Sequence, residues 1–98
     1  DYYIEGEFTA FRCNQNVAKL YNDSDSSDIL IGTVAYSDSS ESDAVVSSNV
    51  RGNFTLGAEK DLTILHQCTL TQTGNGLGVA ADFGVVEVYA DLRLWKIE

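Results

Sequence analysis

Several residue types and patterns are scarce in this chain of 98 residues, which contains no proline and no methionine. Its longest apolar runs, such as residues 29–31, are far shorter than the roughly 20 residues of a membrane-spanning helix. Only six basic residues oppose fifteen acidic ones, which gives a net charge of −9. Nucleic acids and anionic membranes would be repelled by this charge, because phosphate binding needs clustered Lys and Arg. Cations or basic partners suit it better, although acidity also serves simply to keep a small protein soluble.

The start of the chain bears on its location. The sequence begins at Asp1, lacks methionine, and has neither a basic region nor an apolar region in its first residues. These features are expected of a secreted, extracellular protein from which a signal peptide has been removed.

The composition is that of an ordinary globular protein, with 44% hydrophobic and 21% charged residues. The length predicts one domain, residues 1–98. Apolar residues alternate with a period of two, and no long stretch repeats every 3.6 residues. Strands are therefore predicted at residues 2–10, 17–21, 29–36, 44–50, 53–56, 61–70 and 85–97. The fold class predicted is all-β, an antiparallel β-sandwich of seven to eight strands.

The last predicted strand is the longest and has two different faces. Its apolar face carries Val86, Val88, Ala90, Leu92 and Leu94 and is expected to pack on the core. The opposite face includes the candidate partner-binding residues Tyr89, Arg93, Trp95 and Ile97. Aromatic residues exposed on a strand mark binding surfaces, but packing under a loop or another subunit would explain them equally well. The strand is also a possible edge for forming a homo-oligomer.

An acidic, serine-rich segment is the candidate metal site. All nine serines lie between Ser24 and Ser48, a stretch that contains no Lys or Arg. Asp23, Asp25 and Asp28 alternate with serines there, and carboxylates are the hard ligands that calcium prefers. A solvated acidic loop is the alternative interpretation, because the pattern of an EF-hand is absent.

Cys13 and Cys68 are the only cysteines, too few for a structural zinc site of four thiolates. An even number of cysteines in a small chain that looks exported predicts a Cys13–Cys68 disulfide. It would close a loop of about 55 residues, worth roughly 4 kcal/mol in the chain-entropy model. Two buried free thiols are the alternative.

Two glycosylation signals are present in the sequence. Asn22 begins Asn-Asp-Ser and Asn53 begins Asn-Phe-Thr, both of which match the acceptor pattern for N-linked glycans. Both positions fall at predicted loops or strand edges. Such triplets are common by chance, so the signal is weak for each.

His66 is the only histidine, and an enzyme would have to rely on it. It shares a strand face with Ile64 and Cys68, which favours a structural role in or near the core. Side chains two residues apart on a strand are about 7 Å apart, too far for a nucleophile–base hydrogen bond. No catalytic residue is therefore predicted, and a hydrolase based on His66 remains a third interpretation.

Several segments together resemble the transthyretin-like family of secreted proteins. LTILHQC is similar to the family's L-x-I-Y-H-D-C strand, and NVAKLY to its second strand. Cys13 stands at the end of the first strand, as in the family. The matching segments occur in the family's order and are residues 4–8, 16–21, 28–33, 50–56, 62–68 and 89–94. The resemblance implies a secreted prealbumin-like sandwich of two four-stranded sheets. Some family members bind or bridge extracellular targets, including exposed membrane lipid, and hormone-transporting relatives bind ligand in a channel formed by a tetramer.

The sequence and the resemblance together predict a secreted, non-enzymatic binding or bridging protein. Surface loops or the C-terminal strand would contact a protein, a lipid or a small ligand, and no nucleic acid or membrane span is expected. No cofactor is predicted apart from the calcium considered above. The alternative is an extracellular structural or adhesive β-sandwich module that binds calcium at its acidic loop.

Overall fold

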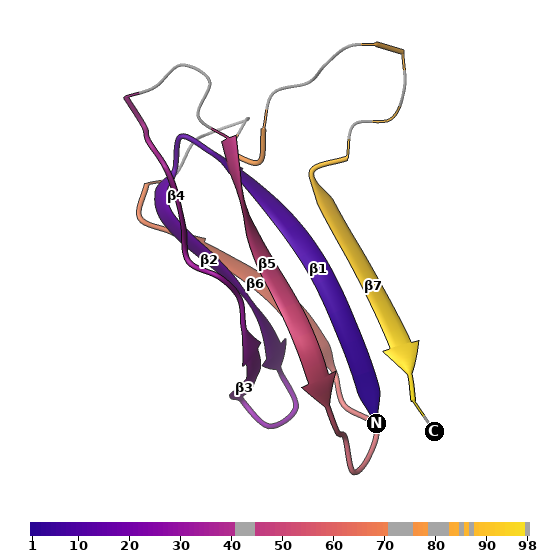
Figure 1. The fold of residues 1–98 in the computed structure, drawn as a ribbon. Coiled ribbons are helices and arrows are strands. Elements are labelled where there is room, and N and C mark those ends of the chain that lie inside the picture. Colours follow the sequence, from indigo (N-terminus) through magenta and orange to yellow (C-terminus); the bar gives the residue numbers. More distant parts are fainter. Residues whose placement is uncertain (41–44, 71–75, 79–82, 85, 87, 98) are drawn as a thin grey trace.

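The chain forms two antiparallel sheets that pack face to face (Figure 1). In the computed structural model, all residues are described except 41–44, 71–75, 79–82, 85, 87 and 98. The described residues form seven strands and no helix. The predicted all-β antiparallel sandwich is confirmed at this level. The prealbumin-like identity of the sandwich stays a prediction.

The first sheet has three strands in the order β5-β1-β7. The central strand β1 (Tyr2–Phe11) pairs antiparallel with β5 (Val45–Phe54) on one side and with β7 (Ala90–Lys96) on the other. In this register Ile4 lies opposite both Gly52 and Leu94. Both β5 and β7 are therefore edge strands of the sheet.

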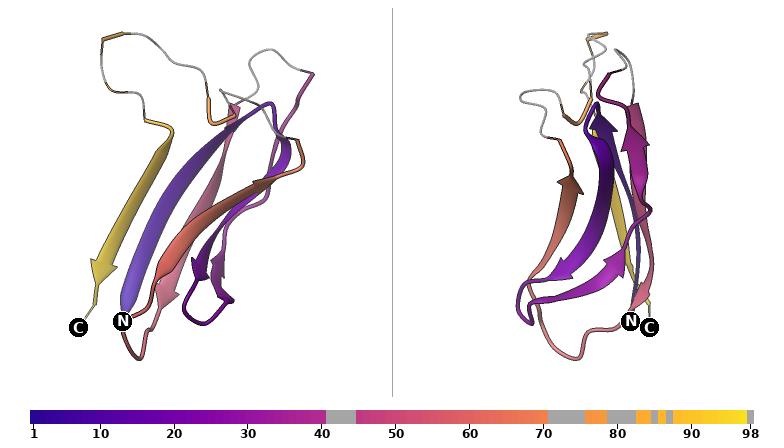
Figure 2. Two further views of the ribbon diagram at one scale, coloured as in Figure 1. Left: turned by 180° about the vertical axis from the view of Figure 1, so that it is seen from behind. Right: turned by 90° about the vertical axis from the view of Figure 1, so that its left-hand side faces the viewer.

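The second sheet is built around β2 (Asn14–Asn22). One side of β2 pairs with β6 (Leu62–Cys68). On the other side, the C-terminal part of β2 pairs with β3 (Ser27–Ile31), and its N-terminal part pairs with β4 (Ala35–Ser37). The two layers are seen edge-on in the right-hand view of Figure 2.

The core lies between β1 and β5 of the first sheet and β2 of the second. Alternation places every second residue of these strands inward, as the sequence pattern predicts. The buried apolar cluster consists of Ile4, Phe8, Ala18, Leu20, Val50 and Phe54. A buried hydroxyl also joins the layers, because Ser48 Oγ accepts from the Ala18 amide at 2.9 Å and donates to the Thr33 carbonyl at 2.6 Å.

The predicted strand 29–36 is in fact two strands, and the interruption is at Gly32. The Gly32 amide donates to the Ala18 carbonyl at 2.8 Å, and the next amide, of Thr33, donates to Asn49 in the other sheet at 2.9 Å. A Cβ at position 32 would lie only 2.5 Å from the Ala18 carbonyl oxygen. Only glycine allows this close approach, so the chain leaves the ladder here and bridges the sheets.

Other strand boundaries also differ from the prediction. Strands predicted at 44–50 and 53–56 are one strand, β5, because Gly52 continues the ladder opposite Ile4 instead of turning. The first strand, predicted at 2–10, continues to Phe11, and the chain turns at Arg12 and Asn14, which have φ values of 55° and 59°. The last strand begins at Ala90, not at 85, and the predicted positions 85 and 87 lie outside the described residues. No helix long and apolar enough to cross a membrane occurs among the described residues.

Candidate functional site

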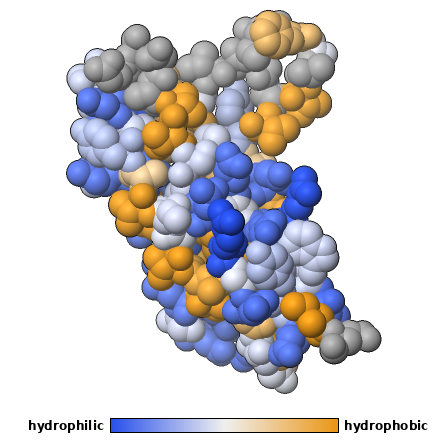
Figure 3. All heavy atoms as spheres, viewed as in Figure 1, coloured by the Kyte–Doolittle hydropathy of each residue, from blue (hydrophilic) through white to orange (hydrophobic). Residues whose placement is uncertain are grey.

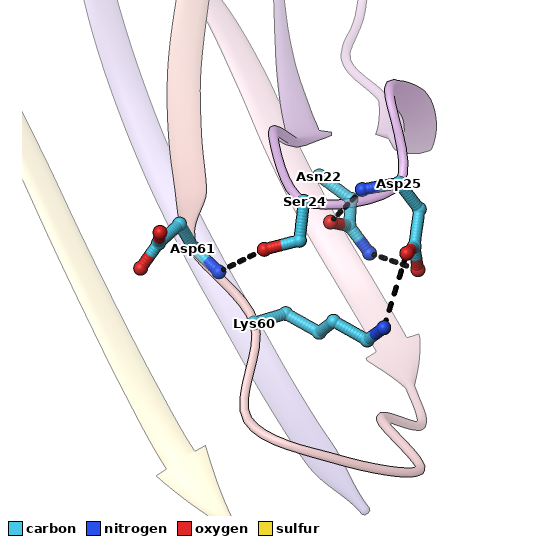
Figure 4. A network of polar contacts seen from close by, with 5 residues as sticks. All are labelled: Asn22, Ser24, Asp25, Lys60 and Asp61. Carbon is cyan, nitrogen blue, oxygen red and sulfur yellow. Dashed lines mark hydrogen bonds and ion pairs between the residues drawn. The ribbon is translucent and has the colours of Figure 1, made fainter.

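The acidic loop between β2 and β3 is held by the segment that precedes β6 (Figure 4). Asn22 accepts from the Asp25 amide at 3.0 Å and donates to the Asp25 carboxylate at 3.1 Å. Lys60 forms an ion pair with the same carboxylate at 3.0 Å. The Ser24 hydroxyl accepts from the Asp61 amide at 2.9 Å. The loop is therefore tied down by partners within the chain.

The three carboxylates predicted to bind calcium have separate partners. Asp23 accepts a hydrogen bond from Thr63, and Asp28 forms an ion pair with Lys19 at 3.0 Å, while Asp25 is held by Lys60. Within the described part of the chain, no group of three or more His, Cys, Asp or Glu side chains is placed to hold a metal ion. The structure does not bring the predicted ligand set together, because each carboxylate is turned toward a different donor of the chain.

The two glycosylation signals differ in exposure. Asn22 is only 5% exposed, and its side chain makes the two bonds to Asp25 described above. A glycan would have to be attached at this buried Nδ2, which donates to Asp25, so the fold makes Asn22 a poor acceptor. Asn53 is exposed on β5, opposite Tyr3, and glycosylation there stays a prediction.

The predicted Cys13–Cys68 disulfide is not present in the structure. Cys13 is buried, with Sγ 3.2 Å from the Phe11 carbonyl oxygen. Cys68 is exposed at the end of β6, where it is paired with Asn16. The Leu70 amide donates to the Cys13 carbonyl at 3.2 Å, so the backbone register brings Leu70 to Cys13 in place of Cys68. The prediction that the protein is secreted is therefore no longer supported by a disulfide.

His66 is half-buried on the inner face of β6, as its strand parity predicts. Its Nε2 lies 3.0 Å from Oδ1 of the buried Asn16, whose amide nitrogen donates to backbone carbonyls. Nε2 therefore carries a proton and donates to Asn16. The imidazole ring lies 6.4 Å from the Phe8 ring, between centroids. Burial lowers the pKa of His66, which favours the neutral ring.

The candidate partner-binding residues lie along β7 and its flanks, on the outer face of the first sheet. Arg93 is exposed and lies 3.8 Å from Asp91, also exposed. The Trp95 ring lies 5.5 Å from that of Tyr3 on β1, between centroids. Tyr89 is half-buried, and its carbonyl accepts the Thr9 amide at 3.1 Å. Ile97 is 44% exposed. The structure thus places all four predicted residues along β7 and its flanks, and three of them are exposed.

The opposite face of β7 does not pack on the core, which corrects the sequence interpretation. Leu92 and Leu94 lie opposite Gly6 and Ile4, so they point inward, yet they are 49% and 55% exposed. Val86 and Val88, predicted to share this face, are 87% and 71% exposed. Seen from behind in the left view of Figure 2, the strands of the second sheet leave β7 uncovered. An edge strand that lacks a facing strand cannot bury its apolar stripe.

The outer edge of β7 has no partner among the described strands, because β7 pairs only with β1 there and ends the sheet. Its far side therefore presents backbone N–H and C=O groups with which no described strand pairs. The sequence analysis gave this strand as a possible edge, but its apolar alternation, which is the same as that of a covered strand, did not show that its inner face is uncovered too.

A charged hollow of about 220 Å³ lies beside β7 on the outer face. In register across the three strands, Glu5 on β1 lies between Arg51 on β5 and Arg93 on β7. Figure 3 shows hydrophilic side chains over the middle of this face. Its lining residues are Glu5, Gly6, Glu7, Asn49, Arg51, Asp91 and Arg93. Opposite charges lie side by side in it, so the hollow does not favour a ligand of a single charge.

Comparison with known protein families, curated proteins and solved structures gave no match for this chain. The transthyretin-like resemblance therefore stays a prediction. Any function assigned to the chain rests on its own geometry.

Proposed function

We propose that this chain is a non-enzymatic binding protein that accepts an extended strand of a protein partner at the open edge of β7. One observation carries the proposal: all of β7 is exposed on both faces, and its outer backbone edge has no described neighbour. Extended peptides bind such edges by adding a strand, with backbone hydrogen bonds for affinity and side-chain contacts for specificity. A secreted location and membership of the transthyretin-like family remain part of the proposal.

The amino acids of β7 support this use of the edge. Proteins usually protect an exposed edge with a proline, a bulge, or a charged residue that points inward. Three of the four inward positions of β7 instead carry Ala90, Leu92 and Leu94, and only the last, Lys96, is charged; the strand pairs with β1 without a register shift. An edge with exposed leucines and a single inward charge at its end is typical of a surface that is covered by a partner.

Other classes of partner receive less support. The calcium-binding adhesive module is not favoured, because Lys60, Thr63 and Lys19 already satisfy the three carboxylates of its proposed site. The mixed charges of the hollow over Gly6 offer no clear selectivity for a small ion. Lipid remains a separate outcome of the test.

A displayed library of random ten-residue peptides tests the proposal. Peptides selected on the wild-type protein should alternate in hydrophobicity and should bind Leu92→Lys at least tenfold more weakly, because an inward-pointing charge blocks strand addition. Ile31→Lys is the matched control, since Ile31 is an exposed apolar residue on β3, in the other sheet. Binding should survive this control.

Two results would contradict the proposal. One is a set of selected peptides that bind Leu92→Lys as well as the wild type. The other is binding only to vesicles of phosphatidylcholine and phosphatidylserine, with no peptide selected, which would make lipid the partner.

A further inference from the structure

We infer that the outer face of the second sheet binds a basic segment of a protein partner, which places one large apolar side chain in a hollow between Val17 and Val34. This surface lies on the other sheet from β7, so the inference goes beyond the proposed function and does not depend on it. The left view of Figure 2 looks onto the second sheet, with β6 in front.

The hollow exists because the ladder beside β2 is interrupted. The chain leaves the ladder at Gly32, between the end of β3 and the start of β4, to bridge to the first sheet. Val17 on β2 therefore pairs with Gln67 of β6 on one side and with no described residue on the other. Val34, which is 75% exposed, borders this gap. The gap is a hollow of about 200 Å³ whose lining includes Val17, Val34, Gln67 and Cys68.

Exposed apolar side chains extend the hollow in both directions along the strands. The even-numbered residues of β2 are buried, so the odd-numbered ones lie on the outer face. Residues directly opposite in a ladder share a face, which places Ile31 beside Lys19 and Tyr36 beside Gln15 on that outer face. Ile31 is 61% exposed and Tyr36 is 52% exposed. An apolar patch of this kind on a sheet marks a contact surface.

The one basic side chain on these strands is turned away from the hollow. Lys19 is the only Lys or Arg in β2, β3, β4 and β6. Its Nζ lies 3.0 Å from the Asp28 carboxylate and 5.7 Å from the centroid of the Tyr21 ring. Asp28 and Tyr21 are paired with each other one row further from Val17, so the ammonium leans away and its charge is matched.

Carboxylates flank this apolar patch at both ends of β2. Asp23 follows β2 at one end and accepts from the neutral Thr63 hydroxyl, so its charge is not matched by that contact. Asp38 follows β4, which pairs with the beginning of β2 at the other end. Hydrogen bonds from Ser40 lower the pKa of Asp38, which keeps it ionised. The complementary partner is therefore basic, and a second copy is disfavoured because it carries the same net charge of −9.

The size of the hollow favours a side chain over a free small molecule. Sites for drug-sized ligands enclose roughly 300–1,000 Å³. A hollow of about 200 Å³ is smaller than these sites. Single large side chains that fill a pocket are the anchors that dominate many protein interfaces. An anchor such as Phe, Leu or Trp, next to Lys or Arg, would match both the hollow and its acidic surroundings.

A displayed library of small cyclic peptides tests the inference, because a small closed ring cannot extend along a strand edge. The selection is made on Leu92→Lys, which keeps the edge of β7 blocked. Selected rings should carry Phe, Leu or Trp next to Lys or Arg. Adding Val34→Lys to this protein should weaken their binding at least tenfold. Raising the salt concentration from about 0.05 M to about 0.5 M should also weaken binding several-fold, because salt screens the carboxylates.

Val45→Lys is the matched control for Val34→Lys, because it places the same charge on an exposed valine at the start of β5, in the first sheet. Binding should survive this control. Alkylation provides a second readout, since Cys68 is exposed and lines the hollow, whereas Cys13 is buried. A bound ring should slow the alkylation of Cys68 at least fivefold.

The inference would be overturned if no ring is selected, if selected rings bind equally well after Val34→Lys, or if they leave the alkylation of Cys68 unchanged. Sedimentation of Leu92→Lys as a dimer that Val34→Lys abolishes would make a second copy the occupant and would overturn it as well. The proposed function is tested separately by linear peptides at β7, whose binding Ile31→Lys should leave intact. Either result can therefore fail without the other.

Discussion

Strands β1 and β7 are neighbours in one sheet and share the same apolar alternation, yet they lie in opposite environments. Ile4 and Phe8 of β1 are 2% and 7% exposed, whereas Leu94 and Leu92 on the same face of β7 are about half exposed. The difference is the facing layer: β2 covers β1, and the described strands leave β7 uncovered. An apolar stripe therefore identifies a surface that needs covering, but not whether this chain or a partner covers it.

The acidic loop provides a second contrast with β7. It carries Asp23, Asp25 and Asp28, and its polar groups are bonded to partners within the chain (Figure 4). Strand β7 carries as many charged residues, Asp91, Arg93 and Lys96, but leaves apolar side chains and backbone groups open. Unsatisfied groups, more than charge density, distinguish the candidate binding surface.

The contrast between covered and uncovered strands predicts its largest effect for one pair of substitutions. Leu20 is 3% exposed and Leu94 is 55% exposed. Leu20→Ala should lower the free energy of unfolding by about 2–5 kcal/mol, because it leaves a cavity, and Leu94→Ala by less than about 1 kcal/mol. Urea unfolding at a concentration where the chain is monomeric measures both. Equal losses would show that β7 is covered in the monomer.

The next effect concerns the hydroxyl that joins the two layers. Ser48→Ala leaves the Ala18 amide and the Thr33 carbonyl without their shared partner and should cost about 1–3 kcal/mol of unfolding free energy. Ser47→Ala is the control, because its hydroxyl bonds Glu7 at the surface, and it should cost less than about 0.5 kcal/mol. Thermal unfolding of the two variants compares them. A loss in Ser48→Ala no larger than in Ser47→Ala would mean that the layers do not depend on this bond.

A smaller effect is expected at the acidic loop. The Lys60–Asp25 ion pair is partly exposed, so Lys60→Met should change the free energy of unfolding by less than about 1 kcal/mol, and by less still at high salt. Calcium should not raise the melting temperature of the wild-type protein, because the three carboxylates have separate partners. A calcium-dependent rise in melting temperature would restore the adhesive-module interpretation.

The smallest effect is the pH dependence that arises from His66. Burial lowers the pKa of its imidazole in the folded state, so the unfolded chain takes up this proton at a higher pH. Stability should therefore decline as the pH falls through about 6.5, the ordinary value of histidine, and His66→Gln should flatten this decline. Urea midpoints between about pH 8 and about pH 5.5 provide the measurement. Parallel declines in the wild type and the variant would assign the effect to other groups.

Local pattern was enough to predict much of the fold. Alternation identified the β class and the inward position of His66. It also assigned Tyr89, Arg93, Trp95 and Ile97 to one face of the last strand. Alternation failed at Gly32, where one predicted strand is two, because the reason is a backbone approach between segments distant in sequence. The prediction that the carboxylates form one calcium site failed for the same reason. Lys60 and Thr63, which hold Asp25 and Asp23, lie far from them in the sequence.

The sequence by itself determined that this chain is built of amphipathic strands, because side-chain parity along a strand is a local property of the backbone. Only the tertiary structure decided which stripe is covered, which carboxylate finds a cation, and whether Cys13 meets Cys68. Each of these depends on what lies across from a residue, and that is set by how segments distant along the chain pack together. The leucines of β7 follow the same local rule as those of the core and are exposed because no described strand lies opposite them.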